Sequence, residues 1–220
     1  AGQTSCNSQA TAGKYACMSG DKSGIGPISG ADAECKCPAG RYQQLGGQSS
    51  CTLAKAGKYA CTSGDTDGTG EVSSAIAECI CPIGRWASTG VSECTLAAPG
   101  KYACMSGDTD GTGVTSSADA ACDCQPGYYQ GTAGETSCTL RATAGTYSCM
   151  SGDRSGVGPI SGADAVCNCP AGRYGTDVGE RECNICPAGQ FSASEKSPEC
   201  TICNLGTYAA PGSDSCTECA

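Results

Sequence analysis

The stretch CPAGRYQQLGGQSSC, from Cys37 to Cys51, decides the fold of this chain, and a close copy, CPAGRYGTDVGEREC, follows from Cys169 to Cys183. Each copy is a short loop with a cysteine at both ends and a Gly-x-Tyr motif inside it. Glycine supplies a backbone conformation that other residues resist, and proline fixes the turn. The aromatic ring can then pack on the neighbouring disulfide as the core of a small module.

The Gly-x-aromatic motif recurs along the chain and predicts a tandem array. Its aromatic residues are Tyr15, Tyr42, Tyr59, Trp86, Tyr102, Tyr129, Tyr147, Tyr174, Phe191 and Tyr208. Longer and shorter loops alternate until Tyr174, and only the shorter kind follows. We therefore expect cysteine-rich repeats at residues 1–50, 51–93, 94–137 and 138–182, and two short modules of the Cys-Pro-x-Gly-x-Tyr type at residues 183–220.

The composition replaces a hydrophobic core with cross-links. The 220 residues include 22 Cys and 33 Gly, but only one Phe, one Trp and no His. Cysteine at this density is typical of a disulfide scaffold. The predicted fold class is small, disulfide-rich and mostly β or irregular, an elongated tandem array of short cysteine-rich modules. Because Gly and Pro interrupt every segment, helices are limited to single turns, for which SGADAEC, SSAIAEC and SSADAAC are candidates with serine as the cap.

Equivalent cysteines of a repeat should pair in equivalent ways, and this favours one scheme of disulfides. The shorter loops join Cys37 to Cys51, Cys81 to Cys94, Cys124 to Cys138, Cys169 to Cys183, Cys186 to Cys200 and Cys203 to Cys216. The longer loops join Cys17 to Cys35, Cys61 to Cys79, Cys104 to Cys122 and Cys149 to Cys167. The sequence leaves open an exchange of partners within each Cys-x-Cys pair, because the loop lengths would hardly change.

Two cysteines remain outside this scheme. Cys6 occupies the closing end of a loop and Cys219 the opening end, so each lacks the half that the other would supply. Either residues 1–220 are a window in a longer chain, or Cys219 of one copy is bridged to Cys6 of the next. Both alternatives predict continuation from head to tail, and a contact of this kind builds a filament unless its rotation closes a ring.

Disulfides at this density predict an extracellular or cell-surface location. The chain starts at Ala1 without an apolar leader, and no apolar run is long enough to span a bilayer, so we expect no membrane insertion and a mature or excised extracellular portion. The net charge of −9 argues against nucleic acid as a partner, since nucleic-acid binding needs a basic surface.

The segment CNICPAGQFSASEKSPECTICNLGTYAAPGSDSCTEC, from Cys183 to Cys219, resembles the cysteine-rich repeats of the ephrin-receptor-like and tumour-necrosis-factor-receptor-like families. Its loops share the form Cys-Pro-x-Gly-x-Tyr followed by a cysteine. The resemblance implies an elongated ladder of small disulfide-linked β modules without enzymatic activity, and it supports the proposed pairing. Large arrays of such repeats are also similar to surface and filament proteins of protists and algae.

Two motifs suggest metal sites, and each has a simpler explanation. Cys183, Cys186, Cys200 and Cys203 have the spacing of a zinc site, but the same period continues to Cys216 and Cys219 as part of the repeat. The SGDTDGTG segments resemble the start of a calcium loop, with candidate ligands Asp65, Asp67, Asp108 and Asp110. Neither segment supplies the acid that completes such a loop, and a solvated turn explains all copies. We therefore expect no cofactor.

The sequence favours a structural role over catalysis. It contains no His for general base chemistry and no nucleophile in a family signature, so we predict that the chain is not an enzyme. The near-identical repeats indicate a structural subunit of an extracellular filament, appendage or coat, assembled head to tail with copies of itself. The many Ser and Thr residues make O-linked glycans a further prediction. The alternative function is a receptor-like ectodomain that binds a protein ligand, with Trp86 as the candidate anchor.

Overall fold

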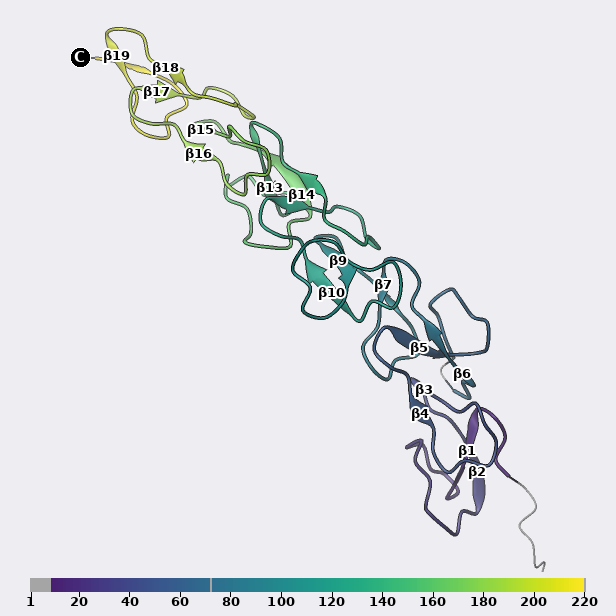
Figure 1. Ribbon diagram of the computed structural model, residues 1–220. Helices are drawn as coiled ribbons and strands as arrows, with labels where there is room; N and C mark the ends of the chain where they lie inside the picture. Colours follow the sequence, from purple (N-terminus) through teal and green to yellow (C-terminus); the bar gives the residue numbers. More distant parts are fainter. Residues whose placement is uncertain (1–8, 72, 220) are drawn as a thin grey trace, which may run out of the picture. The chain divides into compact units, whose positions relative to one another are not determined.

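Residues 9–71 and 73–219 are described by a computed structural model, and within these ranges the chain forms short antiparallel β-hairpins and no helix (Figure 1). Four long hairpins have strands of four residues: β1 (Lys14–Cys17) with β2 (Ala33–Lys36), β5 (Lys58–Cys61) with β6 (Ala77–Ile80), β9 (Lys101–Cys104) with β10 (Ala120–Asp123), and β13 (Thr146–Cys149) with β14 (Ala165–Asn168).

Six short hairpins have strands of two residues each. They are β3 (Arg41–Tyr42) with β4 (Thr52–Leu53), β7 (Arg85–Trp86) with β8 (Thr95–Leu96), β11 (Tyr128–Tyr129) with β12 (Leu140–Arg141), β15 (Arg173–Tyr174) with β16 (Asn184–Ile185), β17 (Gln190–Phe191) with β18 (Thr201–Ile202), and β19 (Thr207–Tyr208) with β20 (Thr217–Glu218). The alternation of loop lengths in the sequence is therefore an alternation of long and short hairpins.

The predicted helical turns are wrong. The segments SGADAEC, SSAIAEC and SSADAAC end in strands β2, β6 and β10. In the first two long hairpins the register pairs Tyr15 with Cys35 and Tyr59 with Cys79. Each of these cysteines is bridged to the strand opposite, so the segment is held extended and the serine has no helix to cap. Tertiary cross-linking here outweighs the weak local preference for a helical turn.

Nine disulfides join the partners that the repeat predicts, with Cα–Cα distances between 5.4 and 5.9 Å. Cys104 and Cys122, the remaining predicted pair, are both disulfide-bonded as well. Within each resolved Cys-x-Cys pair the first cysteine closes the long hairpin and the second opens the short one. The exchange of partners within a Cys-x-Cys pair, which the sequence left open, is therefore not what the structure shows.

Each long hairpin has its own small core around one tyrosine. Tyr15, Tyr59, Tyr102 and Tyr147 are completely buried. Tyr59 packs with the cysteines of both neighbouring bridges and with Ala87, and Tyr15 and Tyr147 lie in equivalent clusters. The short hairpins differ, because Tyr42 and Trp86 pack instead on clusters of three buried alanines. The prediction of an aromatic ring against a disulfide therefore describes the long hairpins.

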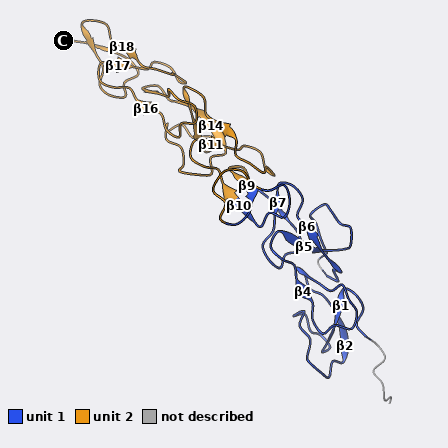
Figure 2. Cartoon of the chain, in the orientation of Figure 1, with its two compact units in different colours: residues 1–97, 103–106, 114–121 blue, residues 98–102, 107–113, 122–220 orange. Residues whose placement is uncertain are grey.

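The chain divides into two compact units, residues 1–97, 103–106 and 114–121, and residues 98–102, 107–113 and 122–220 (Figure 2). The division falls inside the predicted repeat at residues 94–137. Within the second unit the hairpins from β13 to β19 follow one another in chain order (Figure 1). Among the residues that the structure describes, no helix is long and apolar enough to cross a membrane.

The disulfide bonds indicate an oxidising environment, extracellular or secreted. Cytosolic thiols are kept reduced, so a chain with this many bridges is not stable there in its cross-linked form. The bridges also account for the stability of modules whose largest core residue is a single tyrosine. In the chain-entropy treatment, closing a loop of about 15 residues contributes about 3 kcal/mol.

Candidate functional site

The repeated feature with the most regular geometry is a backbone contact between hairpins, which we call the stacking contact. One side is the glycine of the Gly-x-aromatic motif, here called the hairpin glycine. The other side is a residue with positive φ in a later loop, here called the turn residue. The turn residues of the long hairpins are Gly30, Ser74, Ser117 and Gly162, and those of the short hairpins are Gly47, Gly90, Gly134, Gly179, Lys196 and Gly212.

The hairpin glycine lies against the backbone of the turn residue two hairpins further along the chain. A Cβ on the hairpin glycine would collide with the carbonyl oxygen of that residue. The pairs are Gly13 with Ser74, Gly40 with Gly90, Gly57 with Ser117, Gly100 with Gly162, Gly127 with Gly179, Gly145 with Lys196, and Gly172 with Gly212. Glycine is required at this position by the close approach as well as by its positive φ.

Main-chain hydrogen bonds fix the same contact. In five of the seven contacts the turn residue donates its N–H to the carbonyl of the cysteine that opens the preceding short hairpin, at 2.8 to 3.3 Å, and in the other two Gly90 and Gly179 donate to the Ala54 and Ala142 carbonyls at 2.8 and 2.7 Å. The five donor–acceptor pairs with cysteine are Ser74 to Cys37, Ser117 to Cys81, Gly162 to Cys124, Lys196 to Cys169 and Gly212 to Cys186. In the first five short hairpins the residue after the aromatic also donates its N–H to the carbonyl of the residue after the turn residue, as Gln43 does to Ala75 at 3.0 Å. The stacking contact is therefore made almost entirely by backbone atoms.

Side chains add one polar contact to the first stacking contact. The Tyr42 hydroxyl donates to the Glu78 carboxylate at 3.0 Å, and Lys58 pairs with the same carboxylate at 3.0 Å. Burial raises the pKa of Tyr42, and the bond to Glu78 raises it further. Glu34 holds the position of Glu78 in the first long hairpin. There, hydrogen bonds from the Thr11 N–H and hydroxyl, with Lys14 beside them, lower the pKa of Glu34 to about 2.

The loops that join the two strands of each long hairpin, which we call the acidic loops because each contains at least one Asp, are held by the buried tyrosines. The hydroxyl oxygens of Tyr15, Tyr59, Tyr102 and Tyr147 accept the N–H of Gly24, Gly68, Gly111 and Gly156 at 3.0 to 3.1 Å. Burial raises the pKa of Tyr59, Tyr102 and Tyr147. Since the hydroxyl oxygen satisfies a buried backbone donor, each tyrosine ties the loop tip to the disulfide core.

The four candidate calcium ligands accept hydrogen bonds from residues of their own turns in this structure. Asp65 accepts the N–H of Asp67 at 3.1 Å, and Asp67 accepts the N–H and hydroxyl of Thr69, both at 2.6 Å. Asp108 and Asp110 repeat the arrangement with Thr112. The hydrogen bonds from Thr69 and Thr112 lower the pKa of Asp67 and Asp110. The described residues contain no group of three or more Cys, Asp or Glu side chains placed to hold a metal ion.

The cysteines with zinc-site spacing are all engaged in disulfides. Cys183 is bridged to Cys169, Cys186 to Cys200, and Cys203 to Cys216. Disulfide sulfur carries no thiolate charge, so these four cysteines do not form a tetrahedral zinc centre. Cys219 is a free, exposed cysteine. Its predicted partner, Cys6, lies outside the described residues.

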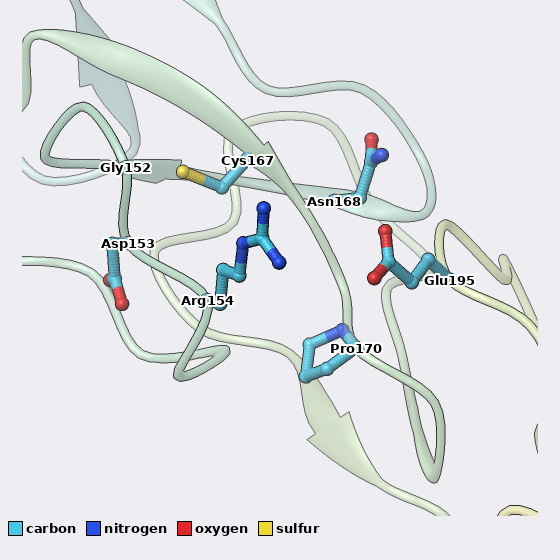
Figure 3. Close-up of a pocket in the computed structure, with 7 residues that line it drawn as sticks. All are labelled: Gly152, Asp153, Arg154, Cys167, Asn168, Pro170 and Glu195. Atoms are coloured by element: carbon cyan, nitrogen blue, oxygen red, sulfur yellow. The ribbon is translucent and has the colours of Figure 1, made fainter.

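A shallow hollow recurs in the first and fourth repeats. One hollow, of about 290 Å³, is lined by Asp153, Arg154, Asn168 and Glu195 among others, and Figure 3 shows Arg154 and Glu195 turned toward the same space. The other, of about 360 Å³, is lined by residues that include Asp21, Lys22 and Lys36. The charged side chains of this hollow, in the first repeat, are mostly basic. Those of the hollow in the fourth repeat include two acids, Asp153 and Glu195. The two hollows lie at equivalent places of the repeat, but the charged side chains that line them differ.

Trp86, the candidate ligand anchor, is half-buried on Ala97, Ala103 and Ala118. It occupies the same place as Tyr42, which packs on Ala54, Ala60 and Ala75. The indole ring thus fills the position of its repeat and does not stand out as a separate exposed patch.

Comparison with known protein families finds no family model that matches the chain, and comparison with curated proteins finds no similar protein. The function must therefore be argued from the chain's own geometry. That geometry points to the stacking contact, which the chain repeats with few changes, and away from the hollows, whose side chains differ.

Proposed function

We propose that the protein is a structural subunit of an extracellular filament, appendage or coat, in which like modules stack from head to tail. The observation that carries the proposal is the stacking contact, made seven times between described hairpins by backbone groups. A surface that binds one specific ligand usually depends on varied side chains presented on loops. Nearest-neighbour contacts that repeat without change serve instead to build length.

The distribution of variable and constant positions supports this proposal. The hairpin glycines and turn residues hold the same backbone conformation throughout, including where serine or lysine replaces glycine. The hollows change from mostly basic in the first repeat to partly acidic in the fourth. A module selected for stacking needs only the first set to be constant. We also retain the likeness of the tail to the cysteine-rich repeats of surface and filament proteins as part of this proposal.

Electron microscopy of the native material tests the proposal most directly. We expect filaments or a periodic coat whose axial repeat corresponds to about one chain. A preparation of dispersed monomers would contradict the filament and favour the receptor-like alternative, in which the protein acts alone. The same preparation should be stained with and without reductant, because bridged filaments are expected to break up when their disulfides are reduced.

The covalent link between subunits has its own test. We propose that Cys219 of one chain is bridged to Cys6 of the next. Non-reducing electrophoresis of the native protein should then show a ladder of multiples that collapses to one band with reductant. The Cys219→Ser variant is the matched control and should run as one band in both lanes. A single band for the native protein without reductant would rule out this bridge, although not stacking itself.

O-linked glycans are part of the proposal for the assembled surface. Ser63, Thr66 and Thr109 lie exposed in the acidic loops, where attached sugar would not disturb the hairpin cores. We expect the intact mass of the native protein to exceed the polypeptide mass by whole sugar units. A mass equal to that of the bare oxidised polypeptide would contradict this part.

A further inference from the structure

Eight of the ten hairpin glycines are buried, and the last two are not. Gly206 is exposed, Gly189 is partly exposed, and a Cβ on either would meet no atom within 4 Å. In the other hairpins the hairpin glycine lies against a turn residue two hairpins further along the chain, so Gly189 and Gly206 should each have such a partner. The end of the described chain therefore presents one half of the stacking contact without its partner.

The polar groups of the same face are also unpartnered. The opening cysteines of five earlier short hairpins accept the N–H of a turn residue, but the Cys203 carbonyl accepts no hydrogen bond from any described residue. The Ala209 N–H and the Gly206 N–H likewise have no acceptor in the described part of the chain, whereas the equivalent Gly189 N–H donates to Ala209 at 2.9 Å. Tyr208 is 55% exposed, while the other five short-hairpin aromatics are half-buried.

The first long hairpin presents the other half. Its turn residue, Gly30, is exposed, and nothing lies within 4 Å of a Cβ placed on it. The following residue, Ala31, is exposed as well, whereas its counterparts Ala75, Ala118 and Ala163 are 0, 1 and 3% exposed because an earlier hairpin covers them. The Gly30 turn carries the same sequence, ISGADA, as the turn at Gly162, which does form the stacking contact.

We propose that these two faces bind each other between two copies of the chain, with the Gly30 turn of one copy stacked on the β17–β18 and β19–β20 hairpins of the other. Gly30 takes the place of Gly162 and lies against Gly189, and its N–H donates to the Cys203 carbonyl. The Ala209 N–H donates to the Ala31 carbonyl, as Gln43 does to Ala75. This inference rests on the proposed head-to-tail function and names the surface that carries it.

The same register identifies one side-chain contact between the copies. In the first stacking contact the short-hairpin tyrosine, Tyr42, donates to the glutamate of the following long hairpin, Glu78. At the junction of two copies the corresponding residues are Tyr208 and Glu34. The Glu34 carboxylate is ionised, since its pKa is about 2, and it is able to accept this bond at neutral pH. A second copy thus supplies partners for the Cys203 carbonyl, the Ala209 N–H and the Tyr208 hydroxyl.

The test measures self-association of the 220-residue chain in a Cys219→Ser background, so that no bridge through this thiol contributes. Sedimentation velocity over about three decades of concentration gives the dissociation constant. We expect Gly189→Asn to raise it by more than about 10-fold, because the new side chain occupies the place of the Gly30 turn. Gly152→Asn is the matched control, since Gly152 also has positive φ and open space around its Cβ, but lies in an acidic loop.

Tyr208→Phe tests the register without changing the backbone. It removes only the hydroxyl, so we expect self-association to weaken by about 2- to 10-fold. Amide hydrogen exchange in the unmutated sequence gives a measure that needs no variant at the interface. The Gly30 N–H should exchange rapidly in dilute protein and become protected in concentrated protein, while the N–H of Gly20, in the acidic loop, should not change.

The outcomes separate this inference from the filament proposal. If the native protein forms filaments, but Gly189→Asn associates as well as Gly152→Asn and the Gly30 N–H stays unprotected, the surface is wrong and the filament stands. If the chain remains monomeric at every concentration while native filaments are seen, the stacking face does not join copies by itself and the inference fails. Monomers in both preparations would overturn both proposals.

Discussion

Ser74 holds a left-handed backbone conformation, φ 64°, that glycine holds at the same position of the two outer repeats. Its hydroxyl oxygen is buried and has no hydrogen-bond partner among the described residues. A left-handed conformation costs an L-residue about 1–2 kcal/mol, and glycine loses about 0.5–1 kcal/mol more than alanine in chain entropy on folding. The buried hydroxyl adds to the cost of serine, so the balance favours glycine.

We therefore expect Ser74→Gly to stabilise its hairpin by about 1 kcal/mol. The reverse change, Gly30→Ser, should destabilise the first long hairpin by a similar amount. Amide hydrogen exchange of residues 73–80 in Ser74→Gly, compared with the unmodified chain, measures the local free energy of opening. Unchanged or faster exchange in the variant would show that the serine conformation carries no strain.

The buried tyrosines make the fold sensitive to alkaline pH. Burial raises the folded-state pKa of Tyr59, Tyr102 and Tyr147 above the ordinary value of 10.0. A group whose pKa is raised by folding stabilises the fold fully at pH values below its unfolded pKa, and this contribution is lost as the pH rises through the folded pKa. The stability contributed by these hydroxyls should thus be intact at neutral pH and decline only at pH values above 10.

Absorbance of tyrosinate near the red edge of the tyrosine band checks this expectation. The native protein should ionise part of its tyrosines at higher pH than the reduced and denatured chain does. Tyr147→Phe should shrink the delayed fraction, since burial raises the pKa of this tyrosine. Identical titration curves for native and denatured protein would contradict the burial argument.

At the scale of the hairpin, the stacking contact separates two kinds of glycine. Gly172 and Gly152 both have positive φ, 80° and 89°, so alanine is strained at either position. A Cβ on Gly172 would also collide with the Gly212 carbonyl, whereas a Cβ on Gly152 would meet nothing within 4 Å. The difference between the two alanine variants therefore isolates the close approach between hairpins from the backbone strain that they share.

We expect Gly172→Ala to cost about 1–3 kcal/mol more than Gly152→Ala, the usual penalty of overpacking a tight contact. Denaturant unfolding with the disulfides intact measures both, and amide exchange of the Gly212 N–H shows whether its bond to Cys186 is lost. Equal losses for the two variants would mean that the hairpins adjust to the extra atom, and the contact would then not be rigid enough to carry a repeat.

The sequence was sufficient for the hairpin disulfides and insufficient for the stacking contact, and both facts have a physical cause. Cys37 and Cys51 recur with constant spacing, so one rule applied to every copy predicts their pairing. The contact of Gly13 with Ser74 is made by backbone atoms two hairpins apart, and glycine alone marks it in the sequence. The sequence alone does not distinguish a glycine that is needed for a tight turn from a glycine that allows another backbone segment to approach closely.

The aromatic residues show the same limit. Tyr15 and Tyr42 both follow the motif Gly-x-aromatic, and the sequence predicts a single role for them. The structure gives them two, because Tyr15 lies inside a long hairpin among its cysteines and Tyr42 lies between hairpins on buried alanines. Which neighbour a ring meets depends on how hairpins follow one another, and no spacing within one repeat records that.

At the scale of the whole molecule, the repeats should be interchangeable. Every stacking contact is made by backbone groups, and nine of the disulfides have both ends within one hairpin. Removal of one full period, residues 51–93, brings Cys94 to the place of Cys51 and Ser117 to the place of Ser74. In a quasi-one-dimensional array, the loss of one unit leaves the neighbouring interfaces of the same kind.

We expect the chain without residues 51–93 to fold with a Cys37–Cys94 bridge and with all later bridges unchanged, as peptide mapping by mass spectrometry would show. The control removes residues 62–93, which are not a full period. It joins Cys61 directly to Cys94 and removes Cys79 and Cys81, the partners of both, so scrambled bridges should result. Scrambling in the full-period deletion as well would mean that pairing depends on the particular neighbours of each repeat. The hairpins would then not be equivalent units, and the argument from a repeated backbone contact to an assembly of any length would lose its basis.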